Sequence, residues 1–184
     1  MSTSVLVIQG AGPGAHDADR AIADELQRAL GDGFRVAFPR MPGEPDPQVD
    51  VWQRAIAREA RRGAADVVVA HSAGAAILAD LLAQGRGPVD LPRARSAFLL
   101  APPYIGQGGW ELGGFHLDAQ RADPPALGLA LFLYFGEADT TVPVSHAALY
   151  GAIFPLAAFT RLAGCDHQFT GHVARLARDV EAAV

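Results

Sequence analysis

The residue of this sequence best placed for chemistry is Ser72, in the stretch VVVAHSAGAA at residues 67–76. Small residues, Ala70 and Gly74, stand two positions before and two positions after it. A nucleophilic serine on a crowded turn between a strand and a helix needs such neighbours, although the usual pattern has glycine at the first position. A serine at the end of a strand is also a favoured helix N-cap. The stretch by itself is compatible with either role.

The partners that a serine nucleophile requires follow later in the chain. A serine hydroxyl needs a general base, and the base needs an acid to fix its tautomer. Asp139 lies in the run GEADTTVP at residues 136–143, and His167 lies in the run GCDHQF at residues 164–169. Both runs follow apolar segments, and the order serine, acid, histidine is the one found with a strand–turn–helix nucleophile. The three residues together predict nucleophilic catalysis by Ser72.

A glycine-rich loop, QGAGPG at residues 9–14, follows the first apolar segment. It does not match the dinucleotide fingerprint G-x-G-x-x-G, because its glycines are spaced two apart, and it lacks the Gly-Lys-Ser/Thr of a phosphate-binding loop. Nucleotide binding is therefore disfavoured. The loop is either a tight turn between a strand and a helix or a segment whose backbone amides face a cleft.

Apolar segments and helical patterns alternate along the chain, and these elements must position the three residues. We expect strands at 5–8, 34–38, 66–70, 95–100, 129–135 and 157–162, and helices at 18–30, 49–62, 72–84, 144–153 and 170–184. The strands are apolar almost throughout, which is typical of a parallel sheet covered by helices on both faces. Residues 101–126 are rich in glycine and proline and are expected to be irregular.

Length and composition predict a single domain over residues 1–184. The net charge is −5 and no basic run is present, so neither nucleic acid nor an anionic membrane surface is an expected partner. The segment MSTSVLVIQG has neither the charge of a signal peptide nor the length of a membrane span. Cys165 is the one cysteine, so no intrachain disulfide can form. We expect a cytoplasmic protein without membrane insertion, and leave the oligomeric state open.

Four motifs together resemble those of a small α/β-hydrolase: QGAG after the first strand, AHSAG at the third, G-x-x-D-x-x-V-P at 136–143 and G-x-x-H-x-F at 164–169. The sequence is similar to compact, nearly capless serine hydrolases over almost its whole length. Ala70 and Gln9 depart from the family, which usually has glycine and histidine there. The resemblance implies a three-layer α/β/α fold with about six mainly parallel strands in the order 2-1-3-4-5-6 and no sizeable cap domain.

The resemblance also implies roles for individual residues. Ser72 attacks an acyl carbonyl, His167 takes and returns its proton, and Asp139 holds the imidazole. The backbone amides of Ala73 and Ala11 form the oxyanion hole.

Other residues could compete for two of these roles. Glu137 is the alternative acid, Asp166 is expected to point elsewhere, and the ring of His71 is expected to point away from Ser72. The remaining histidines are alternative bases, but only His167 lies in the loop after the last strand, where this fold places the base. They are His16, His116, His146 and His172.

The irregular segment 101–126 stands where larger relatives insert a cap. Gly12 of the first loop and three aromatic residues of this segment are candidates for the substrate pocket; the aromatic residues are Tyr104, Trp110 and Phe115. An ordered surface loop with buried aromatic residues is the competing interpretation.

The predicted function is hydrolysis of a small carboxylic ester through an acyl-enzyme, with no metal or organic cofactor. Thioester hydrolysis, amide hydrolysis and acyl transfer use the same three residues and remain alternatives. A second alternative is a non-catalytic binding or regulatory protein on a hydrolase scaffold.

Overall fold

A computed structural model of the chain describes residues 2–110, 116–117 and 127–184. One sheet of six strands runs through it in the order β2-β1-β3-β4-β5-β6, and every neighbouring pair is parallel. The sequence-based prediction of the strand order is confirmed. The strands are β1 (Thr3–Ile8), β2 (Phe34–Ala37), β3 (Val67–His71), β4 (Ser96–Leu100), β5 (Ala130–Gly136) and β6 (Ala158–Leu162).

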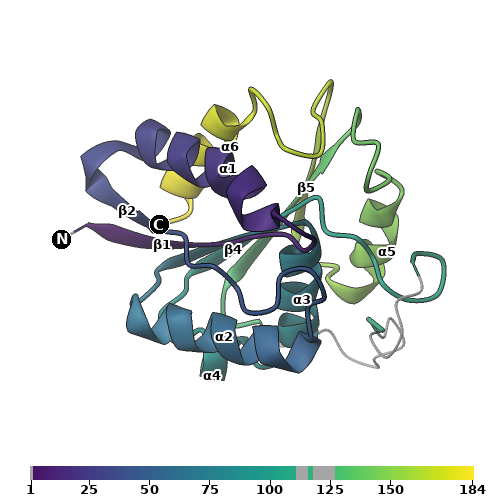
Figure 1. The fold of residues 1–184 in the computed structure, drawn as a ribbon, viewed down its shortest axis with the longest axis horizontal. Helices are drawn as coiled ribbons and strands as arrows, with labels where there is room; N and C mark the ends of the chain where they lie inside the picture. The colour runs from purple at the N-terminus through teal and green to yellow at the C-terminus, as the bar shows by residue number, and fades with distance from the viewer. Residues whose placement is uncertain (1, 111–115, 118–126) are drawn as a thin grey trace.

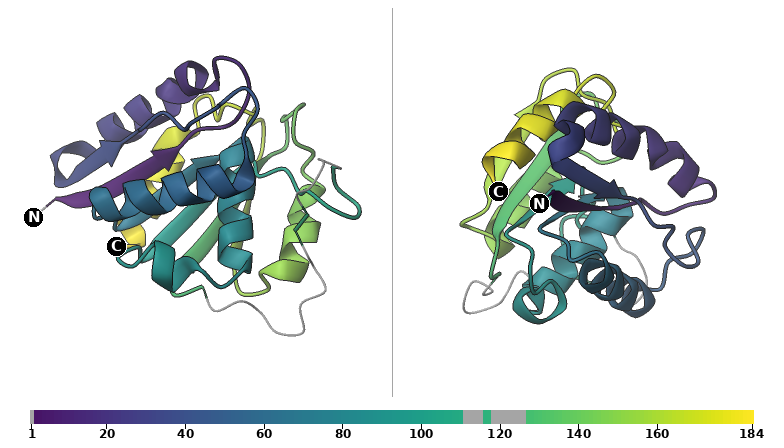
Figure 2. Two further views of the ribbon diagram at one scale, coloured as in Figure 1. Left: turned by 60° about the horizontal axis from the view of Figure 1, so that its bottom comes forward. Right: turned by 90° about the vertical axis from the view of Figure 1, so that its left-hand side faces the viewer.

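Helices cover both faces of the sheet, which gives the three layers (Figure 1). The α-helices are α1 (Ala15–Leu30), α2 (Val49–Arg62), α3 (Ser72–Ala83), α4 (Gly87–Asp90), α5 (His146–Ile153) and α6 (Val173–Ala182), and a 3-10 turn, η1, spans Gly31–Gly33. Figure 2 shows α1 and α6 together on one face, with α2 and α3 on the other. The short α4 was not predicted, because four residues are too few to carry a helical period.

Burial on both faces explains the apolar strands. All five residues of β3 are buried, and successive side chains of a strand point to opposite faces. Val67 and Val69 pack in the cluster beneath α1 and α6, whereas Val68 and Ala70 pack in the cluster with α2, α3 and α5. Two hydrophobic cores, one on each side of the sheet, therefore fix the strands that carry the functional loops.

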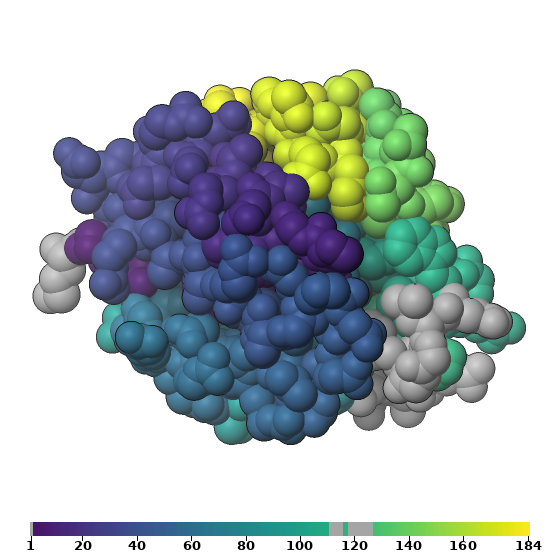
Figure 3. Space-filling model, viewed as in Figure 1, coloured from purple at the N-terminus to yellow at the C-terminus, as the bar shows by residue number. Residues whose placement is uncertain are grey.

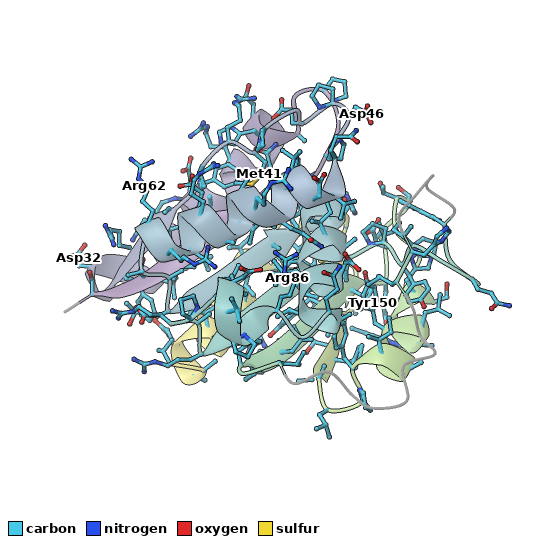
Figure 4. The ribbon with its side chains drawn as sticks, turned by 90° about the horizontal axis from the view of Figure 1, so that it is seen from below. Asp32, Met41, Asp46, Arg62, Arg86 and Tyr150 are labelled. Carbon is cyan, nitrogen blue, oxygen red and sulfur yellow. The ribbon has the colours of Figure 1, made fainter. Side chains whose placement is uncertain are left out.

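Parallel strands deliver their C-terminal ends to one edge of the molecule. Figure 4 places Asp46, in the loop after β2, at the same end of the molecule as Tyr150 of α5, and Asp32 and Arg62, near the ends of α1 and α2, at the opposite end. The loops after β1, β3, β5 and β6 meet at the edge where ligands bind in open α/β sheets.

No cap domain is found over this edge in the described ranges. Ile105 and Trp110 form a single bridge within the segment predicted to be irregular, and Phe115 lies outside the described residues. None of the helices that the structure describes combines the length and the apolar character needed to cross a bilayer.

Candidate active site

Ser72 lies on a strained turn between β3 and α3. Its φ of 51° is in the left-handed region, which costs a non-glycine residue about 1–3 kcal/mol. Close packing around the turn holds this conformation. A Cβ at Gly74 would collide with the carbonyl oxygen of Gln9, and one at Gly10 would lie 3.1 Å from the Ser72 Cβ. Ala70, which replaces the first glycine of the usual pattern, is fully buried in β3 without disturbing the turn.

A chain of hydrogen bonds joins Ser72 to His167 and Asp139. The His167 Nε2 lies 3.1 Å from the Ser72 hydroxyl oxygen, and the His167 Nδ1 lies 2.7 Å from the Asp139 Oδ2. Because the carboxylate accepts at Nδ1, the Nε2 of the neutral ring is free to accept the serine proton. The structure thus brings together the three residues that the sequence singled out.

The Asp139 carboxylate is held by its own loop. Its Oδ1 accepts the backbone N–H groups of Thr141 at 2.7 Å and Val142 at 2.8 Å, and its side chain is 1% exposed. A Cβ at Gly136 would strike the carbonyl of Cys165, so this glycine lets the loop after β5 pack against the loop after β6. Such fixed hydrogen bonds orient the acid toward His167 before any substrate binds.

The microenvironment of His167 favours its neutral form. Burial lowers the pKa of His167 below its ordinary value of 6.5, and a positive charge on His71 acts in the same direction. The hydrogen bond and the charge of Asp139 raise the pKa but do not overcome these two effects. A base that is neutral at physiological pH can accept the serine proton.

The residues considered as alternatives take other positions. Glu137 is exposed, and the Asp166 Oδ1 accepts the backbone N–H of Thr170 instead of facing His167. His146 accepts the backbone N–H of Tyr104, and His16 stacks on Phe38. His71 is buried and its ring nitrogens face Asp19 and the backbone of His167, as discussed below.

In the described part of the chain, one backbone N–H group of the loop after β1 has no hydrogen-bond acceptor. The N–H of Gly10 donates to Asp19 at 2.6 Å, and the N–H of Gly12 donates to the carbonyl of Glu44 at 2.7 Å. Between them, the amide of Ala11 has no acceptor among the residues that the structure describes. The amide of Ala73 lies in the first turn of α3, where backbone N–H groups lack partners within the helix. Both amides are suited to hold an oxyanion.

The loop after β1 is fixed from outside by Glu44. The Glu44 carboxylate accepts the side-chain amide of Gln9 at 2.8 Å and the backbone N–H of Gly14 at 3.3 Å. Gln9 in turn accepts the amide of Met41 at 2.9 Å. Gln9, at a position where the family resemblance implies histidine, therefore anchors the loop to the segment after β2. Glu44 was not predicted, because the residues of the glycine-rich loop and of α1 that it contacts lie 28 to 35 positions away in the chain.

A cavity of about 290 Å³ opens beside Ser72. Gly12, a candidate for the substrate pocket, lies at its wall. The lining residues are 10–15, Ala18, Asp19, His71, Ser72, Thr141, His167 and Gln168. In Figure 3 the purple atoms of the N-terminal segment and the yellow atoms of the C-terminal segment meet on one face of the molecule. The cavity is small, and its wall combines the small residues of the loop after β1 with polar side chains of the site.

Two of the aromatic residues predicted to wall the pocket lie elsewhere. Tyr104 is 2% exposed, stacks edge-on against Tyr150 and donates its hydroxyl to the carbonyl of Leu117. Trp110 packs edge-on against His146. Neither lines the cavity at Ser72. Tyr104 is packed in the core around α5, whereas Trp110 is half-buried and also packs against the cluster beneath α1 and α6. The competing interpretation, a loop with buried aromatic residues, describes Tyr104 better.

A larger cavity, of about 420 Å³, lies at the opposite ends of the strands. Residues 127–132 and 154–158 line it, and its walls are mostly apolar. It contains none of the groups of the hydrogen-bond chain, so size alone does not identify the active site. Within the described part of the chain, no group of three or more His, Cys, Asp or Glu side chains is arranged to hold a metal ion.

No protein-family model and no curated protein matches the sequence, whereas solved structures match it over nearly its whole length. A protein of the α/β hydrolase superfamily from Xanthomonas campestris is 17% identical, with a TM-score of 0.63 and full coverage of both chains. The esterase domain of a Rhodothermus marinus protein is 14% identical, with a TM-score of 0.62 over 98% of this chain and 85% of that one.

A thermophilic esterase from Thermogutta terrifontis with propionate bound is 16% identical, with a TM-score of 0.60 over 98% of this chain and 83% of that one. At sequence identities this low, the structural similarity establishes the fold alone. This chain has the α/β-hydrolase fold.

Proposed function

We propose that this protein is a serine hydrolase that cleaves small carboxylic esters through an acyl-enzyme on Ser72. The observation that carries the proposal is the unbroken chain of hydrogen bonds from Ser72 through His167 to Asp139. An isolated serine N-cap has no need of a buried histidine and an oriented carboxylate. The esterase activities named for structures of the same fold support the reaction class.

The first half of the reaction forms the acyl-enzyme. The Ser72 oxygen attacks the ester carbonyl while His167 Nε2 takes the hydroxyl proton, and Asp139 stabilises the resulting imidazolium. The amides of Ala11 and Ala73 hold the oxyanion. Collapse of the tetrahedral intermediate breaks the ester C–O bond, and His167 gives its proton to the departing alcohol. Water then attacks the acyl group by the same steps, which releases the acid and restores Ser72.

The preference for small acyl groups follows from the cavity. About 290 Å³ lined by a glycine-rich loop accommodates a short chain and offers little apolar surface to a long one. The propionate bound to the Thermogutta terrifontis esterase shows that a protein of this fold can hold a short acid.

Hydrolysis of p-nitrophenyl acetate, butyrate and octanoate tests the proposal. We expect kcat/KM to be highest for the short esters and to vanish in Ser72→Ala. Ser145→Ala is the matched control, because Ser145 is exposed and makes no side-chain cap to α5. A folded wild-type protein that hydrolyses none of the esters would overturn the proposal, and so would a Ser72→Ala variant with undiminished activity. A preference for octanoate would contradict the proposed substrate size.

A further inference from the structure

A second aspartate–histidine pair lies directly beneath the Ser72 site. Asp19 belongs to α1 and His71 is the last residue of β3, so 52 positions separate them in the chain. The His71 Nδ1 lies 2.8 Å from the Asp19 Oδ2, and each side chain is only 3% exposed. The His71 ring also lies 4.8 Å, centroid to centroid, from the His167 ring. Burying two such groups is costly unless their hydrogen bonds serve each other or their neighbours.

The partners of the pair determine its protonation. The His71 Nε2 lies 2.8 Å from the carbonyl oxygen of His167, which can only accept, so this nitrogen carries a proton. Burial raises the pKa of Asp19, but hydrogen bonds from His71, Gly10 and Gln168 and the charge of His71 outweigh it, so the net shift is downward. Asp19 is therefore a carboxylate, and its Oδ2 is an acceptor for the Nδ1 of His71. Both ring nitrogens of His71 therefore face acceptors, the Asp19 carboxylate at one side and the His167 carbonyl at the other.

The two ends of the pair reach two different loops of the site. The Asp19 Oδ2 accepts the N–H of Gly10, the residue before the Ala11 amide assigned to the oxyanion hole. At the other end, His71 donates to the backbone of His167 itself. One buried ion pair thus ties the loop after β1 to the loop after β6, and both are attached to the strand that carries Ser72.

We propose that Asp19 and His71 are positioning residues: Asp19 fixes the oxyanion loop through Gly10, and His71 fixes the backbone of the base through the hydrogen bond of its Nε2. This inference rests on the proposed function of Ser72. Misplacing a reacting group by about 1 Å can cost on the order of 100-fold in rate, so such a tether is effective although each side chain is only 3% exposed at the cavity wall. The titratable groups that face His71 are Asp19 from α1 and His167 from the loop after β6, with Asp139 beyond His167.

Two substitutions of His71 separate its two hydrogen bonds. The amide nitrogen of Gln in His71→Gln can reach the place of Nε2 and keep the bond to the His167 carbonyl. The shorter Asn in His71→Asn reaches only the place of Nδ1 and keeps only the bond to Asp19. We expect His71→Asn to lower kcat by roughly 10- to 100-fold with little change in KM, and His71→Gln to lose several-fold less.

The pH profile of kcat/KM provides a second measurement, which a purely structural role of His71 would not change. Both variants remove a positive charge beside His167, so the acidic limb of kcat/KM should move to higher pH in both. Equal losses of kcat in the two variants, together with an unchanged acidic limb of the kcat/KM profile, would contradict the inference. Thermal unfolding verifies that each variant is folded.

Asp19→Asn extends the test to the other end of the pair and has a matched control. Asp66 is a buried aspartate at the far end of β3 that also accepts a backbone N–H and pairs with Arg93. Asp19→Asn should lower kcat, whereas Asp66→Asn should leave kcat unchanged. If both variants behave alike, Asp19 has no special role in positioning.

A measurement on the wild-type protein separates this inference from the proposed function. Nitrogen-15 NMR at neutral pH should show a proton on the His71 Nε2, which the hydrogen bond to the His167 carbonyl requires, and an unprotonated Nε2 on His167. An unprotonated Nε2 on His71 would overturn the inference whether or not the protein hydrolyses esters. Absence of ester hydrolysis with a protonated Nε2 on His71 would instead count against the proposed function alone.

Discussion

The His167 Nε2 lies 3.1 Å from the Ser72 hydroxyl oxygen, although 95 positions separate the two residues in the chain. Parallel strands produce this proximity, because β3 and β6 end at the same edge of one sheet. The distance is within the range of a hydrogen bond between a nucleophile and its general base. This hydrogen bond predicts that Ser72 is a nucleophile activated by His167, which substitutions and pH profiles can test.

Asp139→Asn should lower kcat by roughly four orders of magnitude, because an amide cannot fix the imidazole tautomer or stabilise the imidazolium. The measurement is the hydrolysis of p-nitrophenyl acetate. Glu137→Gln is the matched control: Glu137 is exposed in the same loop and should be dispensable. If Glu137→Gln is the more damaging change, Asp139 is the wrong acid.

The pH dependence of kcat/KM should follow the protonation of His167. The base works only when Nε2 is unprotonated, and burial together with the charge of His71 lowers its pKa below 6.5. Activity should therefore be fully developed at neutral pH and fall as the pH drops through a midpoint below 6.5. Initial rates from acidic to neutral pH measure this midpoint. A midpoint above 6.5 would show that the microenvironment of His167 differs from the one described.

Gly74→Ala should destabilise the protein by about 1–3 kcal/mol, because the new Cβ would meet the Gln9 carbonyl and the Ile8 side chain. Urea unfolding measures the effect. Gly151→Ala provides the contrast, since a Cβ built there in α5 would have no atom of another segment within 4 Å among the described residues. That variant should gain about 0.5–1 kcal/mol from helix propensity. Equal effects of the two changes would mean that the turn at Ser72 is not crowded.

Cys165 should be chemically inert in the folded protein. It is fully buried, and burial together with the charges of Asp166 and Asp139 raises its pKa to about 12. Iodoacetamide should modify it slowly at about pH 8 in the native state and rapidly in urea, where the pKa returns to about 8.5. Comparable rates in the two states would contradict the structural role assigned to this thiol.

Periodicity and strand composition were enough to predict most of the architecture. The helix expected at 49–62 has those bounds, because Trp52 and Ile56 mark its buried face. The helix expected from residue 18 begins earlier, at Ala15. The carboxylate of Glu44 accepts the N–H groups of Gly14 and His16 there, and a cap supplied by a distant residue leaves no local signal.

The Asp19–His71 pair was missed because acidic residues on helices are usually solvated. A signal was nevertheless present in the sequence. Asp19 precedes Ile22, Ala23 and Leu26 by three, four and seven positions, so it lies on the buried face of α1. An acidic residue at such a position must have a partner in the interior. Its identity as His71 depends on the packing of α1 against the sheet, which local patterns do not encode.

Labelling by a fluorophosphonate, followed by peptide mass spectrometry, tests the role of Ser72 most directly. This probe phosphonylates a serine whose hydroxyl is activated by a base and leaves ordinary serines unmodified. We predict that one adduct forms per chain, on the peptide containing Ser72, and that it is lost in Ser72→Ala but retained in Ser145→Ala. A folded wild-type protein that remains unlabelled, or an adduct that persists in Ser72→Ala, would contradict the assignment of Ser72 as the nucleophile.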